Sequence, residues 1–111
     1  MSRRASGLHA WFLQRVSAVY IGFFVLILLA RLWLVPPADV DAWRQWVASP
    51  LVSVGFALLI PCLALHAWVG VRDVILDYVH PLGWRLLMLS LAAFYLLAVS
   101  AWALFALERL S

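Results

Sequence analysis

Residues 12–35 read FLQRVSAVYIGFFVLILLARLWLV, an apolar stretch that stops at two consecutive prolines, Pro36 and Pro37. A helix needs about 20 mostly apolar residues to cross the hydrocarbon core of a bilayer. Proline cannot continue a helix, because it lacks the backbone N–H and its ring clashes with the preceding turn. This stretch is therefore predicted to form a transmembrane helix that ends at the prolines.

Two further apolar stretches have the length of a membrane span. One covers residues 50–71 and stops at the charged pair Arg72 and Asp73, and the other covers residues 82–107. The sequence thus predicts an all-α integral membrane protein with three transmembrane helices in a single domain, residues 1–111. The linker at residues 38–49 combines carboxylates with two tryptophans, which predicts a helical turn lying at the membrane interface. Residues 72–81 are predicted to form the second loop.

The composition excludes most soluble functions. Hydrophobic residues make up 68% of the chain and charged residues only 12%, whereas a soluble domain is nearer half apolar and a quarter charged. The net charge of +3 comes from scattered arginines, so no nucleic-acid surface is expected. The single cysteine, Cys62, excludes an internal disulfide, and the chain has neither a flavin-binding glycine motif nor a cysteine cluster for iron–sulfur chemistry.

The arginines predict the orientation in the membrane. Loops on the cytoplasmic side carry the excess of positive charge. One side holds Arg3, Arg4, Arg15, Arg72 and Arg85, and the other holds Arg31, Arg44 and Arg109. We therefore expect a cytoplasmic N-terminus and a periplasmic C-terminus. The start of the chain resembles neither a cleavable signal peptide nor a mitochondrial transit peptide, which favours a bacterial inner membrane over a mitochondrial one.

One ionisable side chain, His66, falls inside the second span. A charge at mid-membrane costs roughly 2.5–3.5 kcal/mol on insertion scales, so such a residue is a candidate functional site. Neutral imidazole can bind haem iron, with a partner helix supplying the second ligand, or it can simply hydrogen-bond a neighbouring helix. Gly70 lies one turn later on the same face. It could admit a flat macrocycle or merely a closely packed helix, and the residues alone leave both alternatives open.

A second candidate site lies where the second span is predicted to give way to its loop. Asp77 and Tyr78 are adjacent there. A phenol can donate a hydrogen bond to a quinone carbonyl, and a carboxylate beside it can accept a proton or orient a basic neighbour such as Arg72. The plainer alternative is an aspartate that caps the third span and a tyrosine of the interfacial aromatic belt.

A third group of polar residues, His9, Arg15 and Ser17, lies around the start of the first span. Arg15 would have to extend its guanidinium to the interface or meet an anion. That anion could be a haem propionate or the phosphate of a phospholipid.

Two segments give these residues a family resemblance. Residues 65–81, LHAWVGVRDVILDYVHP, resemble the hydrophobic membrane anchor subunits of succinate dehydrogenase, respiratory complex II, of the small cytochrome b type. The pattern is a histidine, a glycine four residues later, and Asp-Tyr eleven and twelve residues after the histidine. Residues 7–18, GLHAWFLQRVSA, resemble the N-terminal motif of the same family. One position departs, because His80 stands where a lysine often precedes the proline.

The resemblance implies a role for each matching residue. His66 would be an axial ligand of haem b, which is shared with a second anchor (cytochrome b) subunit that supplies the other ligand. Tyr78 would hydrogen-bond the carbonyl of ubiquinone, the substrate, and Asp77 would hold Arg72 or an arginine of the partner chain. His9 and Arg15 would lie near the haem propionates.

The resemblance also implies partners and a role in a larger complex. A flavoprotein subunit would oxidise succinate, and an iron–sulfur subunit would pass electrons to the quinone. This chain would be a non-catalytic anchor of the tricarboxylic acid cycle and respiratory electron transport. Two alternatives are the anchor of a quinol:fumarate reductase and a small non-redox membrane protein. The second is disfavoured because a transporter should carry polar residues at mid-membrane depth on several spans, and the third span has only the small polar groups of Ser90 and Ser100, plus Tyr95.

Overall fold

Helices are the only regular secondary structure over the part of the chain that the structure describes. The structure is a computed structural model that describes residues 3–110, with side chains from residue 7 onward. Its four helices are α1 (Arg3–Leu34), α2 (Val40–Ala48), α3 (Pro50–Tyr78) and α4 (Leu82–Leu110). The predicted all-α class is confirmed.

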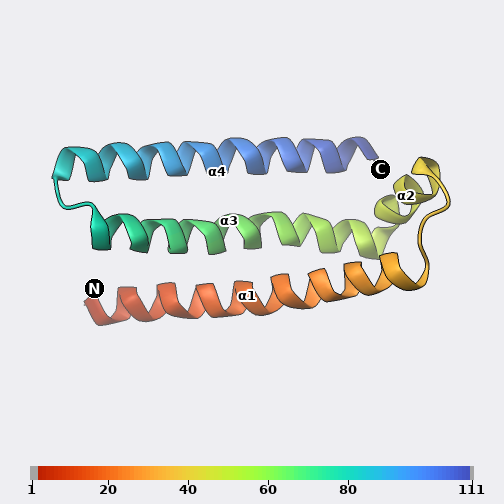
Figure 1. The fold of residues 1–111 in the computed structure, drawn as a ribbon, viewed down its shortest axis with the longest axis horizontal. Helices are drawn as coiled ribbons and strands as arrows, with labels where there is room; N and C mark the ends of the chain where they lie inside the picture. Colours follow the sequence, from red (N-terminus) through yellow and green to blue (C-terminus); the bar gives the residue numbers. More distant parts are fainter. Residues whose placement is uncertain (1–2, 111) are drawn as a thin grey trace.

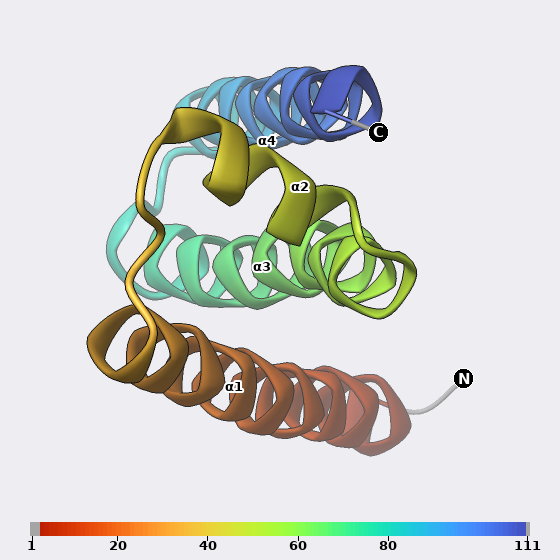
Figure 2. The same cartoon turned by 90° about the vertical axis from the view of Figure 1, so that its right-hand side faces the viewer.

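The three long helices lie side by side in a row, with α3 in the middle (Figures 1 and 2). Helix α3 packs against both α1 and α4, whereas α1 and α4 make no contact with each other within the described residues. The row measures 52 × 24 × 23 Å. Because the three long helices alternate in direction, the start of α1 and the end of α4 lie at opposite ends of the long axis of the molecule (Figure 1).

Each long helix is apolar enough to cross a membrane. The candidate spans are Gly7–Leu34, Pro50–Tyr78 and Leu82–Leu110, which confirms the predicted number of spans. At 1.5 Å per residue, a helix of 29 residues such as α3 is about 44 Å long, whereas the hydrocarbon core is about 30 Å thick. The helix ends therefore extend into the interfacial layers.

The prediction that residues 72–81 form the second loop is wrong. Helix α3 continues through Arg72 and Asp73 to Tyr78, so the second loop consists of Val79–Pro81 alone. The charged pair does not end the helix because Arg72 Nη2 donates to Asp73 Oδ1 at 3.2 Å and both side chains reach the surface. The break comes with Pro81, since the residue before a proline is disfavoured in helical geometry.

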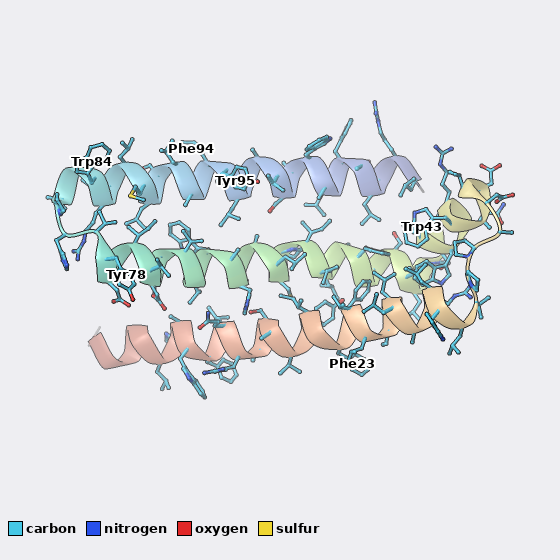
Figure 3. All side chains as sticks on the ribbon, viewed as in Figure 1. Phe23, Trp43, Tyr78, Trp84, Phe94 and Tyr95 are labelled. Atoms are coloured by element: carbon cyan, nitrogen blue, oxygen red, sulfur yellow. The ribbon has the colours of Figure 1, made fainter. Side chains whose placement is uncertain are left out.

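The connection between α1 and α3 is a short helix, as predicted. Asp39 caps the N-terminus of α2 by accepting a hydrogen bond from the Ala42 backbone N–H at 2.7 Å, which satisfies one of the free donors of the first turn. Val47 of α2 is buried, and the Arg31 guanidinium of α1 lies 5.5 Å from the ring centroid of Trp46. The cation and the indole thus join α1 to α2 at the end of the row where Trp43 lies (Figure 3).

Helices α1 and α3 approach each other closely at Gly55. The Tyr20 hydroxyl donates to the Gly55 carbonyl at 2.7 Å, and a Cβ at Gly55 would lie 2.7 Å from Phe24 Cε2. The Phe24 ring is itself held edge-on against Phe56, with 4.9 Å between centroids. Gly55 therefore permits the close approach of the two helices, as small residues do in membrane proteins.

We predict that Gly55→Ala destabilises the protein. The added methyl group must displace a packed Phe24 ring, and overpacking typically costs about 1–3 kcal/mol, which exceeds the gain of up to about 1 kcal/mol from replacing a helical glycine. The measurement is the unfolding midpoint in a mixed-detergent titration.

The matched control is Gly22→Ala, because nothing lies within 4 Å of a Cβ at Gly22. This variant is expected to be neutral or slightly stabilised. Equal effects of the two substitutions would contradict the close contact at Gly55.

Candidate functional site: a groove beside His66

A groove with a volume of about 750 Å³ runs along one face of α3. Small-molecule and cofactor sites are typically about 300–1,000 Å³. The groove is open to the surroundings because α1 and α4, on either side of α3, do not meet. Its walls come from all three long helices: Gln14 of α1; His66, Ala67, Gly70, Val71, Val74 and Ile75 of α3; and Met88, Leu91 and Ala92 of α4.

His66 lies farther from the end of its helix than the sequence suggested. Because α3 ends at Tyr78 rather than near Arg72, His66 is about 18 Å along the helix axis from that end, at 1.5 Å per residue. The side chain is half-buried, and Gly70 and Val74 follow it at four-residue intervals along the same face of α3. The groove thus holds one imidazole in an otherwise mostly apolar wall.

The imidazole has a polar neighbour on α1. Ser17 Oγ lies 3.4 Å from His66 Nδ1, and the same hydroxyl donates to the Gln14 carbonyl at 3.0 Å. Ser17 is only 4% exposed. The sequence placed Ser17 among the polar residues at the start of the first span, but it did not reveal that this serine faces His66.

Gly70 is not required by the packing of the helices. A Cβ there would meet only Gln14 Nε2, at an ordinary contact distance of 3.9 Å. The glycine that the packing does require is Gly55, which sequence reasoning missed. Gly70 instead keeps the wall of the groove flat beside His66.

Asp77 and Tyr78 lie in the last turn of α3 rather than in a loop. Tyr78 is 78% exposed and lies at the end of α3 that is beside the start of α1 (Figure 3). Asp77 and His80 are also exposed. Arg72, which was expected to interact with Asp77, pairs with its neighbour Asp73.

Arg85 of α4 holds this end of α3 in place. Its Nη2 donates to the Leu76 carbonyl at 2.7 Å, and its Nε donates to the Val79 carbonyl. The last carbonyls of a helix lack partners within the helix, and a cation there is also favoured by the helix dipole. The sequence suggested Arg85 only as an orientation signal. The sequence feature that could have predicted this contact is its position, only four residues after Pro81, which brings it close to the end of α3.

His9 and Arg15 do not line the groove. Both side chains are exposed, and the Arg15 guanidinium lies 5.6 Å from the centroid of the Trp11 ring. Arg15 and Ser17 point in directions about 160° apart around the axis of α1, given 3.6 residues per turn. Since Ser17 faces α3, Arg15 faces away from it.

Within the described part of the chain, no three His, Cys, Asp or Glu side chains gather where they could hold a metal ion. His66 is thus a single nitrogen donor in the groove.

The fold and this groove define a multi-pass membrane protein that presents one imidazole on an open apolar face. The family described as "Succinate dehydrogenase/Fumarate reductase transmembrane subunit" matches residues 1–107. The chain belongs to this family, which confirms the resemblance seen in its sequence. It is 26% identical over 103 residues to the succinate dehydrogenase hydrophobic membrane anchor subunit of Coxiella burnetii (strain RSA 493 / Nine Mile phase I), an alignment that covers 93% of this chain and 88% of that protein.

We predict that Arg85→Met loosens the end of α3. Loss of charge-assisted hydrogen bonds of about 1.5 kcal/mol would speed amide exchange about tenfold, most clearly at Val79, whose N–H donates to the Ile75 carbonyl at 2.9 Å. Hydrogen–deuterium exchange with mass spectrometry of peptides covering residues 75–82 measures the change. The matched control is Arg109→Met at the far end of α4. If Arg85→Met exchanges no faster than this control, Arg85 does not hold the turn.

Proposed function

We propose that this chain is a membrane anchor subunit of a succinate dehydrogenase complex, which binds haem b together with a second anchor chain and contributes to the site of ubiquinone reduction. The observation that carries the proposal is the single imidazole on the wall of an open, apolar groove, with Gly70 on the same face. Membership of the succinate dehydrogenase and fumarate reductase family supports the anchor role.

The residues of the groove fit a haem. His66 supplies one nitrogen donor, and the volume of about 750 Å³ lies in the range of cofactor sites. Gly70 leaves the wall flat without being needed for packing, and the remaining lining is mostly apolar, which suits a porphyrin face and excludes water. When bound, haem b supplies a site that accepts or donates one electron. The second axial ligand is assigned to the partner anchor chain.

The end of α3 fits a quinone head group. The exposed Tyr78 hydroxyl can donate a hydrogen bond to a quinone carbonyl, and the neighbouring Asp77 carboxylate can take up and pass on a proton. Reduction of the quinone to a quinol takes two electrons, from an iron–sulfur subunit, and two protons from water at the membrane surface. Arg85 contributes by fixing the backbone that carries both side chains.

The same end of the row is the proposed docking side for the soluble subunits. The iron–sulfur subunit would lie there between the membrane and a flavoprotein that oxidises succinate, so this chain is not catalytic by itself. The excess of arginine at this end favours a cytoplasmic location for it, and we assign the chain to a bacterial inner membrane with its C-terminus in the periplasm.

His9 and Arg15 were expected near the haem propionates. Because Arg15 faces away from α3 and beside Trp11, it could meet a propionate only from the outer side of α1. A phospholipid phosphate is the partner that this position favours, since lipid surrounds the exposed face of a spanning helix.

We predict that His66→Ala abolishes or alters the b-type absorbance of the purified complex, because it removes an axial nitrogen of the iron. Difference spectra of the reduced and oxidised complex measure the change. The matched control is His80→Ala, which replaces an exposed histidine beyond the end of α3 and is expected to leave the spectrum intact. An unchanged spectrum for His66→Ala would rule out the ligand role.

We predict that Tyr78→Phe lowers quinone reductase turnover about tenfold, since a lost hydrogen bond of about 1.5 kcal/mol corresponds to that factor. Succinate oxidation with an artificial dye should remain intact, because the dye does not need the quinone site. Tyr95→Phe, an exposed tyrosine in the middle of α4 (Figure 3), is the control. Equal losses in both assays would indicate misassembly, and no loss in either would contradict the quinone contact.

A further inference from the structure

The contact between Ser17 and His66 restricts where the imidazole proton can lie. A serine hydroxyl has one proton to donate and lone pairs that accept. Ser17 Oγ lies 3.0 Å from the Gln14 carbonyl oxygen, which can only accept. The shorter of the two contacts takes the hydroxyl proton to Gln14, which leaves a lone pair of the Ser17 oxygen for His66 Nδ1, 3.4 Å away.

An acceptor opposite Nδ1 favours the tautomer that carries its proton on Nδ1. In neutral histidine the other ring nitrogen, Nε2, then keeps its lone pair. We propose that Ser17 is a positioning residue that holds His66 as the Nδ1–H tautomer, so that Nε2 is the nitrogen presented to the iron. This inference rests on the proposed haem-binding function.

The burial of Ser17 supports this role. The residue is only 4% exposed, and its hydrogen bond to the preceding turn of α1 fixes the oxygen in space. Histidines that bind metals commonly donate their second ring N–H to an acceptor, which orients the ring and raises the basicity of the ligating nitrogen. Here the acceptor comes from a different helix, so the packing of α1 on α3 sets the orientation of the ligand.

The test replaces Ser17 in the complete complex by alanine and by threonine. Loss of a partner to a metal ligand typically costs 10–100-fold in metal affinity or activity. For Ser17→Ala we expect haem to transfer to excess apomyoglobin at least tenfold faster. We also expect a more positive midpoint potential, because a less basic ligand stabilises ferric iron less, and a change in the low-spin electron paramagnetic resonance g values.

Ser17→Thr keeps the hydroxyl and should restore the potential and g values toward those of the unchanged complex. The matched control is Ser53→Ala, a half-buried serine of α3 that does not line the groove. If the alanine complex does not assemble, Ser17→Cys, with similar size and a weaker acceptor, is measured in the same way and should shift in the same direction.

Two outcomes separate this inference from the proposed function. If His66→Ala keeps the b-type spectrum, the haem assignment itself is wrong. If His66→Ala loses the spectrum while the assembled Ser17 variant matches the unchanged complex in haem transfer, potential and g values, only the role of Ser17 is overturned.

Discussion

The structure depends on the central position of α3, which packs against α1 on one side and α4 on the other while those two helices stay apart. A row of this kind cannot enclose a core. Among the residues with described side chains, only four apolar ones are buried: Val47, Leu59, Val69 and Ile75. In lipid this exposure has little cost, because lipid tails are as apolar as the side chains that face them. The outer residues Phe23 and Phe94 illustrate this arrangement (Figure 3).

Polar groups on the open face differ from these apolar side chains in the cost of their exposure to lipid. His66 and Gln14 line a groove that none of the described residues covers, and polar groups exposed to hydrocarbon are costly. The proposed haem and second anchor chain would cover this face and relieve that cost. The two ends of α3 are fixed by different interactions. Aromatic packing around Gly55 holds one end to α1, and the Arg85 guanidinium holds the other end to α4.

Much of this arrangement could be predicted from the sequence because it depends on local properties. Apolar length gives the spans, Pro36 and Pro37 end α1, and Asp39 marks the start of α2. Arg72 and Asp73 were misleading, since two adjacent charges of opposite sign can pair at the surface of a continuing helix. The roles of Ser17, Gly55 and Arg85 could not be predicted, because each depends on how one helix is rotated against its neighbour. Apolar periodicity does not define that rotation when all faces of a helix are apolar.

The central claim is that His66 of this chain binds the iron of a haem held on the open face of the row. The most direct measurement is pulsed electron paramagnetic resonance of the oxidised complex, reassembled so that only this chain carries ¹⁵N-histidine and with His9 and His80 replaced by glutamine. The account predicts one strongly coupled ¹⁵N nucleus on the low-spin iron, together with an unlabelled nitrogen from the partner chain. A spectrum of the haem-containing complex with no ¹⁵N coupling to the iron would contradict it.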